Sequence, residues 1–489
     1  MKAQDLKNAI LQMAMQGKLV PQDFADESAS ALLERIREKH GDLIRQKAVK
    51  APKGGGSVVY RDGDSWFERC GKSAPSCIDD EIPFEIPKNW EWARLDAVAN
   101  LYTGNSIPEK VKAAKYTGLT DGIEYIATKD LSFDGVFDYS NGIRIPYEED
   151  GFKTANSDDI LMCIEGGSAG RKIGILDRTV CFGNKLCSFS SYGLNQRFLY
   201  YFLQSPAFRV QFNGGMSGII GGVSIKNLSK LFICIPPIAE QMRIVERVDK
   251  LMPLIGDYGE LENAREALDA ALPDRLRKSI LEMAIEGMLL KRRCPESYML
   301  LEQQTEAVLK DCLPSDWTVT ELASLCSTKI SYGIIKLGKE DPEHGILTLR
   351  CSDVKPGYID PTKIRTVERE LSEQYSRTTL EPNDIVVNVR GTLGGVAVVP
   401  ASMAGYNVAR EVAVIRLKDK RYSRYVSYLL MSPYFDRFML SSLRGIAYKG
   451  LNMGILSRLP VPLPSVEEAN SIADKLEVLL DACDAMKTK

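Results

Sequence analysis

Histidine is nearly absent from this 489-residue sequence, which contains only His40 and His344. A catalytic Ser-His or Cys-His pair therefore has almost no base available. The 11 cysteines are odd in number and form no CxxC pair, a pattern typical of reduced, buried thiols in a cytoplasmic protein. Cys70 and Cys77 could form half of a zinc site, but the sequence offers too few histidines to complete it. Nucleophilic and zinc chemistry are therefore disfavoured.

Long apolar runs are also missing. No stretch reaches the length of a transmembrane helix, and the N-terminus has the pattern of an amphipathic helix rather than of a signal peptide. We therefore expect a cytoplasmic protein without a membrane partner. The hydrophobic fraction of 44% is ordinary for globular domains. The net charge of −2 counts mildly against nucleic-acid binding, although residues 313–464 carry a basic excess.

The sequence contains itself twice, and the second copy is circularly shifted. Residues 87–95 (Pro-Lys-Asn-Trp, then Leu) match residues 314–322, and residues 201–208 match residues 428–435. In the other direction, residues 6–14 match residues 276–284, and each of these segments is followed by a glycine. This arrangement predicts a pseudo-two-fold molecule whose termini meet. Such a molecule suits a ligand of near-two-fold symmetry, and duplex DNA is the commonest one.

The pattern along the chain predicts helices and mixed domains. Apolar spacing indicates helices over about 3–20 and 28–48, and a glycine-rich, polar stretch to about residue 80 indicates a flexible linker without a counterpart in the second copy. Residues 81–236 alternate short β-branched runs with turns and include one helix over about 194–213. Residues 313–464 repeat this mixed pattern.

Two helical segments carry apolar residues at alternating spacings of four and three. The first set is Ile244, Val248, Leu251, Ile255 and Tyr258, and the second set is Ile472, Leu476, Leu479, Cys483 and Met486. Matching register predicts that the two seams pair as a coiled coil, and the alternative is that each helix packs on its own domain. Pro253 and Pro273 should bend or break the central helix.

The sequence does not complete any of the catalytic motifs that it partly resembles. Residues 166–172 are glycine-rich but lack the spacing of a phosphate loop. Asp159, Glu165 and Lys172 could suggest a metal-dependent nuclease, yet Arg390 and Ala397 replace the last two in the second copy. No segment has the Asn-Pro-Pro-aromatic pattern that holds a flipped base in DNA methyltransferases. The sequence argues for a binding module. A free-standing nuclease or methyltransferase with a degenerate site, and a structural scaffold without a nucleic-acid role, stay open as alternatives.

Residues that could read DNA lie in the turns around the aligned strands. Arg, Lys and Asn contact base edges or phosphates, and glycine lets the backbone approach a phosphate. In the first mixed domain the candidates are Gly104, Lys129, Arg171, Lys172, Asn184 and Lys185. In the second they are Gly333, Lys336, Arg350, Arg390, Arg410 and Lys449.

The chain resembles the specificity subunit of type I restriction-modification enzymes. The resemblance rests on the Ile-Pro-x-x-Trp opening at residues 86–90, present in weaker form at 313–317, and on the strand segments that end at Gly170 and Gly395. It rests also on the exit at residues 235–241 into a long helix, from which the second copy departs because residues 463–469 keep one proline and lose the glutamine. It covers nearly the whole chain except about residues 49–80.

The resemblance implies a non-catalytic subunit in which two target-recognition domains each read one half of a split, asymmetric DNA target. The paired helices would set the gap between the halves and dock two modification subunits, which use S-adenosylmethionine; restriction subunits would add ATP and Mg chemistry. This chain itself would bind no cofactor and no metal. We expect an α+β fold of two similar mixed domains separated by long antiparallel coiled-coil helices in a circular pseudo-two-fold repeat. The expected parts are 1–48 (helical), 49–80 (linker), 81–236 (first domain), 237–292 (central helical region), 293–312 (linker), 313–464 (second domain) and 465–489 (C-terminal helix).

Overall fold

The computed structural model describes residues 2–52, 55–216, 221–290, 313–441 and 451–487. It divides into two compact units, Met1–Ala264 and Arg265–Lys489. Each unit contains one mixed domain and a pair of helices. The expected linker 293–312 lies outside the described residues. Within the described ranges, no helix is both long enough and apolar enough to cross a membrane.

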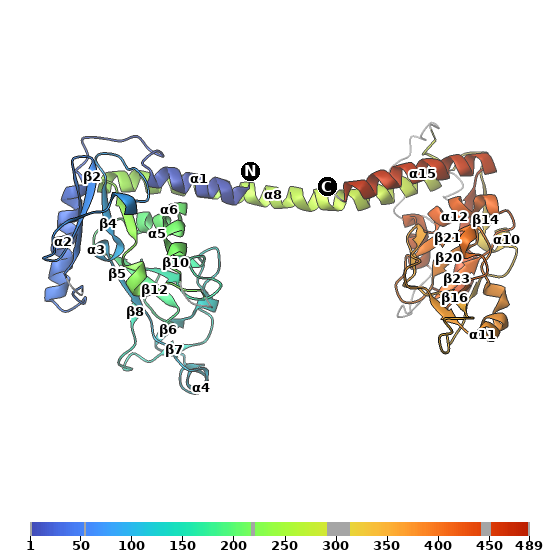
Figure 1. Ribbon diagram of the computed structural model, residues 1–489, viewed down its shortest axis with the longest axis horizontal. Coiled ribbons are helices and arrows are strands. Elements are labelled where there is room, and N and C mark those ends of the chain that lie inside the picture. The colour runs from blue at the N-terminus through green and yellow to red at the C-terminus, as the bar shows by residue number, and fades with distance from the viewer. Residues whose placement is uncertain (1, 53–54, 217–220, 291–312, 442–450, 488–489) are drawn as a thin grey trace. The chain divides into compact units, whose positions relative to one another are not determined.

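An antiparallel helix pair forms one side of unit 1. Helix α1 (Ala3–Met15) lies along the first part of α8 (Ile238–Ile285), as Figure 1 shows. The backbone N–H of Ala3 donates to Glu262 (2.9 Å), and beyond the other end of α1 the side chain of Gln22 donates to Glu240. Because α1 starts beside the later turns of α8 and ends near its first turn, the two helices run in opposite directions.

Two four-stranded sheets build the mixed domain of unit 1. One sheet has the order β10-β9-β12-β5 and the other has the order β7-β6-β11-β8. Only β6 and β11 pair in parallel, and the other pairs within these sheets are antiparallel. The strands are β5 (Ala99–Thr103), β6 (Ile123–Ile126), β7 (Arg144–Ile145), β8 (Thr154–Ala155), β9 (Ile160–Cys163), β10 (Ile173–Ile175), β11 (Val180–Phe182) and β12 (Leu186–Ser191).

A separate strand pair joins the two ends of this domain. Strand β4 (Glu91–Arg94), at its entrance, pairs antiparallel with β13 (Phe232–Ile235), at its exit. All four residues of β13 are buried, which ties the pair to the apolar core. Short helices α3 (Leu95–Val98), α4 (Glu109–Val111) and α7 (Ile225–Leu228) connect the strands. The entrance and exit of the domain are therefore hydrogen-bonded neighbours.

The single helix predicted over 194–213 is wrong, because two helices occupy this segment. Helix α5 (Gln196–Gln204) ends at Ser205, whose backbone is extended, and α6 (Pro206–Gly214) begins directly after it. The hydroxyl of Ser205 accepts a hydrogen bond from the N–H of Phe208 (3.2 Å), and Pro206 occupies the first helical position, where its missing N–H costs nothing. Serine followed by proline is therefore a helix start here.

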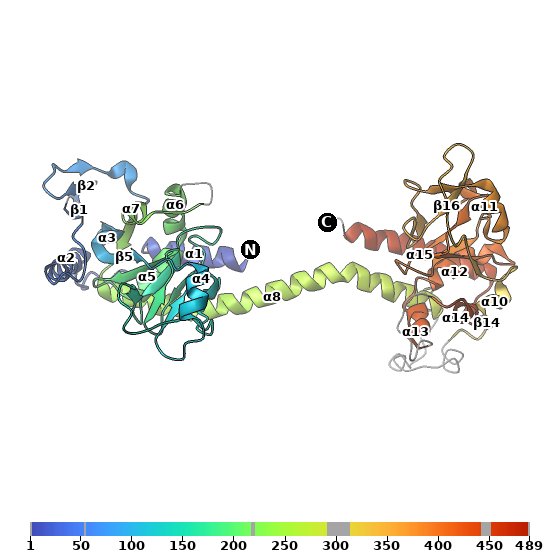
Figure 2. The ribbon, with the colours of Figure 1, turned by 90° about the horizontal axis from the view of Figure 1, so that it is seen from below.

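The predicted flexible linker over 49–80 is also wrong for most of its length. Strands β1 (Ser57–Asp62), β2 (Ser65–Cys70) and β3 (Ser76–Cys77) form an antiparallel sheet, which Figure 2 shows projecting from the unit near α2 (Ala29–Arg45). The sheet is anchored because Val59, Trp66 and Ile78 join the core of unit 1. Arg94 of β4 also forms a salt bridge with Glu68 of β2 (2.6 Å). Burial of these apolar residues therefore holds the stretch in a sheet despite its polar composition.

Unit 2 repeats the fold of unit 1 with the same order of the shared strands, although its second sheet has no counterpart of β8. Its sheets are β15-β23-β20-β21 and β19-β16-β22, with β16 and β22 parallel, and β14 pairs with β24 as β4 pairs with β13. The strands are β14 (Thr318–Glu321), β15 (Ser331–Tyr332), β16 (Ile346–Leu349), β17 (Val354–Lys355), β18 (Tyr358–Ile359), β19 (Arg365–Val367), β20 (Ile385–Asn388), β21 (Val396–Val398), β22 (Asn407–Val408), β23 (Val412–Ile415) and β24 (Pro460–Leu463). The helices are α10 (Leu322–Leu325), α11 (Arg369–Gln374), α12 (Ser423–Leu429), α13 (Pro433–Ser441), α14 (Met453–Ser457) and α15 (Val466–Met486). The predicted pair of similar mixed α/β domains is confirmed.

A second antiparallel helix pair lies in unit 2. Arg277 of α8 forms a salt bridge with Asp484 of α15 (3.1 Å), and Asp274 pairs with Lys487 at the end of α15 (2.7 Å). Towards the start of α15, the ammonium of Lys475 donates to the carbonyl of Leu289 just beyond α8 (2.6 Å). The last part of α8 and α15 therefore run in opposite directions, as α1 and the first part of α8 do in unit 1.

Helix α8 runs through both prolines that were expected to bend or break it. It is a single helix of 48 residues that contains Pro253 and Pro273. A proline inside a helix removes one hydrogen bond and costs about 3 kcal/mol or more. Apolar residues at the two ends oppose this cost, since Val248 is buried in the core of unit 1 and Ile285 in the core of unit 2.

The circular repeat is visible in the packing of two glycines. Gly17 after α1 and Gly287 after α8 both have positive φ angles, +67° and +75°. A Cβ atom on Gly17 would lie 2.4 Å from Cγ of Pro87, and one on Gly287 would lie 2.5 Å from Cγ of Pro314. Glycine is therefore required by both the backbone conformation and the close contact. The matched sequences fold into matched joints between helix and domain.

The tryptophans of the two Pro-x-x-Trp segments make equivalent hydrogen bonds. The indole N–H of Trp90 donates to Glu240 in the first turn of α8 (2.9 Å), and that of Trp317 donates to Glu468 in the first turn of α15 (3.1 Å). Glu240 is fully buried and Glu468 is half-buried. Each mixed domain is therefore fixed to the start of the helix that follows it.

The two predicted apolar seams are buried by their own units. Ile244 and Val248 belong to the core cluster of unit 1, which includes Leu11 of α1. Ile472 and Leu476 belong to the core cluster of unit 2, which includes Leu281 of α8. These four residues are therefore covered within their own units, and pairing of the two seams with each other stays a prediction. The alternative, that each helix packs on its own domain, agrees with these contacts. Tyr258 and Met486, at the ends of the seams, are exposed.

Candidate nucleic-acid interface

Three loops meet at one edge of the mixed domain in unit 1: residues 127–130 after β6, residues 164–172 between β9 and β10, and residues 183–185 after β11. The N–H of Gly183 donates to the carbonyl of Ile126 (2.9 Å), and the N–H of Ile164 donates to that of Lys185 (3.0 Å). The parallel pairing of β6 and β11 explains this meeting, because parallel strands end at the same edge.

This edge brings together the polar residues predicted to read DNA in the first domain. We name as basic loop face 1 the set Lys129, Arg171, Lys172, Asn184 and Lys185. All of these are exposed except Lys172, which is half-buried because its ammonium donates to the carbonyl of Thr128 (3.0 Å). Glu165 lies 4.0 Å from Lys185 and offsets part of the charge. The face can donate hydrogen bonds to phosphates and to base acceptors.

The equivalent loops meet in unit 2. The N–H of Ala409 after β22 donates to the carbonyl of Leu349 at the end of β16 (2.8 Å), and the N–H of Val389 donates to that of Glu411 (2.7 Å). Arg390 and Arg410 are exposed on these loops, and the predicted Lys336 is exposed on the loop after β15. We name Lys336, Arg390 and Arg410 basic loop face 2. The predicted Lys449 lies outside the described residues.

Arg350 has a structural environment that the sequence did not predict. Its guanidinium forms a salt bridge with the buried carboxylate of Asp353 (3.3 Å) and donates to the carbonyl of Lys363 (2.7 Å). Asp353 also accepts the N–H of Arg350 (2.8 Å), as Asp130 accepts the N–H of Ala127 in unit 1 (2.8 Å). Releasing Arg350 towards DNA would leave a buried carboxylate without its cation. Its assignment as a DNA contact is therefore not supported.

Gly104 and Gly333 were expected to let the backbone approach a phosphate, and this expectation is wrong. Both are buried. A Cβ atom on Gly104 would lie 1.8 Å from the carbonyl oxygen of Phe182, and one on Gly333 would lie 1.7 Å from that of Val408. The following N–H groups, of Asn105 and Ile334, donate to these same carbonyls. Glycine is needed because one sheet crosses closely over the other.

The hairpins between the central strands differ in length, which corrects one equivalence. Pairing of β9 with β10 leaves residues 164–172 as a loop, and pairing of β20 with β21 leaves the shorter loop 389–395. The carbonyl of Lys172 accepts the N–H of Cys163 (2.9 Å), and that of Gly395 accepts the N–H of Asn388 (2.8 Å). The structural equivalent of Lys172 is therefore Gly395, not Ala397.

The carboxylates of the nuclease alternative do not meet. Asp159 precedes β9 and Glu165 follows it, so a strand separates them. Asp159 accepts the N–H of Asn156 (2.9 Å), and burial raises the pKa of its carboxyl group. In the part of the chain that the structure describes, no three His, Cys, Asp or Glu residues are grouped to hold a metal ion. The arrangement gives the nuclease alternative no support.

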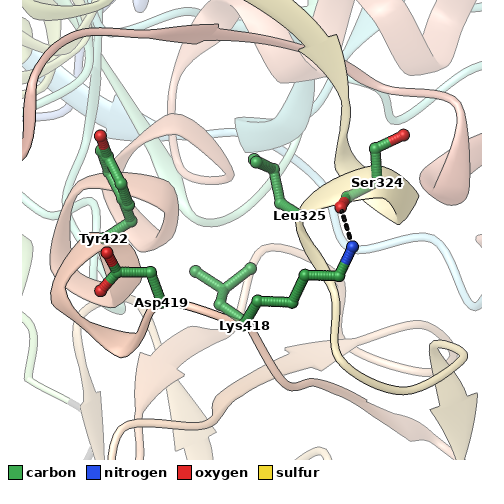
Figure 3. A pocket seen from close by; sticks show the side chains of 6 residues that line it. Ser324, Leu325, Lys418, Asp419 and Tyr422 are labelled. Carbon is green, nitrogen blue, oxygen red and sulfur yellow. Dashed lines mark hydrogen bonds between the residues drawn. The ribbon is translucent and has the colours of Figure 1, made fainter.

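A small cavity in unit 2 lies away from basic loop face 2 and is explained by side-chain packing. Its volume is about 100 Å³, and Figure 3 shows Lys418 crossing it to donate to the carbonyl of Ser324 (2.9 Å). The lining residues are Ser324, Leu325, Leu417, Lys418, Asp419 and Tyr422. In unit 1 the equivalent of Lys418 is Tyr192, because the backbone N–H groups of the two residues donate to equivalent carbonyls. The ring of His40, on α2, stacks on the ring of Tyr192 with 4.2 Å between the ring centroids. No candidate DNA-reading residue lines the cavity.

Sequence reasoning missed two exposed aromatic side chains beside the loops. Phe133 is 56% exposed and Tyr358 is 60% exposed. Each lies in a short hairpin with a glycine at its turn, at Phe133-Asp134-Gly135 and at Gly357-Tyr358. The hairpin signal was present in the sequence, but the exposure of the rings depends on the fold.

Comparison with known proteins identifies the family. Residues 87–257 and 314–489 each match the type I restriction modification DNA specificity domain. The specificity subunit of the type I restriction enzyme EcoBI from Escherichia coli is 27% identical over 414 residues, covering 82% of this chain and 81% of the relative. The specificity subunit of MjaVIII from Methanocaldococcus jannaschii is 24% identical, covering 80% and 86%.

Among solved structures, the HsdS subunit from Thermoanaerobacter tengcongensis aligns with a TM-score of 0.46 at 17% identity, covering 83% of this chain and 93% of that chain. The two domain matches cover well over half of the sequence and coincide with the repeat found in it. The chain therefore belongs to the type I restriction modification DNA specificity family and carries the domain of that family twice.

Proposed function

We propose that this chain is the DNA-recognition subunit of a type I restriction-modification complex, in which each mixed domain reads one half of a split, asymmetric target. The observation that carries the proposal is the pair of equivalent loop edges with different polar residues. Glu165 follows β9 by two residues, and Arg390 follows β20 by two residues. An anion and a cation at one position of a shared frame suit different bases, since carboxylates accept from cytosine and arginine donates to guanine.

The loop edges are built to present these side chains without backbone adjustment. In unit 2 the N–H groups of Val389 and Arg390 both donate to the carbonyl of Glu411, at 2.7 and 3.3 Å. The amide of Asn388 donates to the carbonyls of Cys351 (2.9 Å) and Thr392 (2.9 Å), which fixes the loop on both sides of Arg390. A fixed backbone supports discrimination because a mismatched base leaves a polar group unpaired.

The remaining parts of the proposal concern partners. The antiparallel helices set the gap between the half-sites and dock two modification subunits. These helices are those of residues 237–292 and 465–489, together with the N-terminal helix. Restriction subunits join the same complex in the cytoplasm. Methyl transfer with S-adenosylmethionine and cleavage with ATP and Mg belong to these partners, and this chain is not catalytic. Cations are grouped on the loop edges, whereas the net charge of the whole chain is −2. This distribution supports a subunit that shares its DNA contacts with other subunits.

Domain exchange tests the proposal. Residues 81–236 are replaced by the equivalent domain of a relative, and residues 313–464 are replaced in a second, matched exchange. Each hybrid is expressed with the modification subunit, and methylated sites are determined by sequencing of the genome. We expect each exchange to change a different half of the target. A hybrid that changes both halves, or a wild-type chain that directs no methylation at a split site, would contradict the proposal.

A single substitution tests basic loop face 2. Arg390→Ala should relax preference at one base of the second half-site, worth about 1–3 kcal/mol, if the guanidinium reads a base. A phosphate contact would instead weaken binding to all sequences and lower the salt slope by about one. Binding of the assembled methyltransferase to single-base variants at two salt concentrations separates these cases. Unchanged affinity, preference and slope would remove Arg390 from the interface.

A further inference from the structure

Phe133 is a large apolar side chain held in water by a well-defined hairpin. Leu131 and Phe137 pair across the hairpin, and the N–H of Ser132 donates to the carbonyl of Val136 (2.9 Å). Gly135 has a φ of +82°, and a Cβ atom there would lie 2.7 Å from the carbonyl oxygen of Ile173. The turn is therefore packed closely on β10. The exposure of the ring is imposed by the backbone.

Two cations of basic loop face 1 lie over this ring. The guanidinium carbon of Arg171 is 4.9 Å from the ring centroid, and the ammonium of Lys172 is 5.2 Å from it. The acidic residue of the turn, Asp134, interacts electrostatically with Lys7 of α1. An exposed aromatic ring flanked by cations is a surface that suits nucleic acid, because bases stack on the ring while the cations neutralise phosphates.

The second domain presents an exposed ring from the other strand of the equivalent hairpin, at the position that Val136 holds in the first domain. Strands β17 and β18 form the equivalent hairpin, in which Val354 pairs with Ile359 and Lys355 pairs with Tyr358. The N–H of Gly357 donates to the carbonyl of Val396 (2.8 Å), so this hairpin packs on β21 as the first packs on β10. Tyr358 is as exposed as Phe133. Two domains that differ in their polar residues therefore both present an aromatic ring beside the loop edge.

We propose that Phe133 and Tyr358 are stacking residues, each of which inserts against a base face in the half-site read by its own domain and opens that base step. This inference rests on the proposed function. Apolar wedges of this kind partly unstack a step and add contact that no hydrogen bond supplies. The rings would contribute to affinity and to preference for easily opened steps, while the polar residues of the loop edges read base edges.

The test uses the assembled methyltransferase with duplexes that carry 2-aminopurine at successive positions of the target. Binding should raise the fluorescence at one step in each half-site. Phe133→Ala should abolish the rise in the first half-site only and weaken binding roughly ten-fold or more with an unchanged salt slope. Tyr358→Ala should act only on the second half-site, and Phe133→Trp should retain the signal.

Phe24→Ala is the matched control, because Phe24 is 85% exposed in unit 1. Hydrogen exchange of the hairpin peptides verifies that each variant is folded, and Phe133→Leu serves if the alanine variant is not. Unchanged fluorescence and affinity in Phe133→Ala would overturn the inference. So would a loss of subunit assembly in place of a change in DNA binding, which would make Phe133 a protein contact. Absence of DNA binding by the wild-type complex would instead count against the proposed function.

Discussion

Removal of one indole N–H tests how the first mixed domain is fixed to its helix. Trp90 is 1% exposed and Glu240 is fully buried, so Trp90→Phe leaves Oε2 of the Glu240 carboxylate without its donor, which water cannot replace, while Gln22 still donates to Oε1. A hydrogen bond to a charged group contributes about 1.5–3 kcal/mol, and the smaller ring adds about 1 kcal/mol for the space that it leaves. We therefore expect unit 1 to lose about 3 kcal/mol of unfolding free energy.

The second unit contains the matched control. Trp317→Phe removes the same bond to Glu468, but this carboxylate is only half-buried and water can solvate it. We expect the loss in unit 2 to be smaller by about 1–2 kcal/mol. Hydrogen exchange in increasing urea, followed in peptides from the first turns of α8 and α15, measures the two losses separately in one chain.

The pH dependence gives a second check on the same reasoning. Burial raises the pKa of Glu240, and the hydrogen bonds from Trp90 and Gln22 oppose this effect. Because the folded-state pKa lies above the unfolded value, stability is lost as the pH rises through it. Trp90→Phe raises this pKa further, so its cost should be greater above the folded-state pKa, where the carboxyl group is ionised, than below it, where the group is protonated. Equal costs in both units, or a greater cost at low pH, would refute the argument.

Three further substitutions follow from the contacts. Gly104→Ala should unfold the first domain locally, because its methyl group meets a carbonyl at 1.8 Å, whereas Gly167→Ala meets nothing within 4 Å; proteolysis of the two variants compares them. Arg416→Met should cost about 3–5 kcal/mol in urea unfolding, because it leaves the buried Asp384 without its salt bridge (2.7 Å). Burial and Glu282 raise the pKa of Glu286 to about 7, so ionisation of Glu286 destabilises unit 2 as the pH rises towards 7. Glu286→Gln should therefore raise the melting temperature at about pH 8 and leave it nearly unchanged at about pH 5, and an equal effect at both pH values would contradict this cause.

The architecture was accessible from the sequence because the same packing demands appear twice. Gly17 and Gly287 must accommodate Pro87 and Pro314, so both joints require the same two residue types. The mixed domains were recognisable for the same reason, since strand pairs such as β9 with β12 and β20 with β23 need similar buried residues. Repetition therefore revealed the fold where single motifs were weak.

Features that depend on partners across the fold were not accessible. The segment around Trp66 contains a turn between β-branched and aromatic residues, but its polar composition concealed three strands whose anchors lie in the core. Gly104 was assigned to a phosphate because the crossing of two sheets cannot be read from one strand. Arg350 appeared available because its buried partner, Asp353, is identified only by folding.

The adjacency of β4 and β13 has a consequence for the history of such genes. A segment whose two ends are hydrogen-bonded neighbours can be replaced by a recombination event at both flanks, and the rest of the chain keeps its fold. Trp90 lies directly before this segment and its acceptor, Glu240, lies just after it. Selection after a gene crossover should therefore preserve the residues at the boundary while the interior diversifies. New combinations of half-sites can then arise in one step, without an intermediate protein that fails to fold.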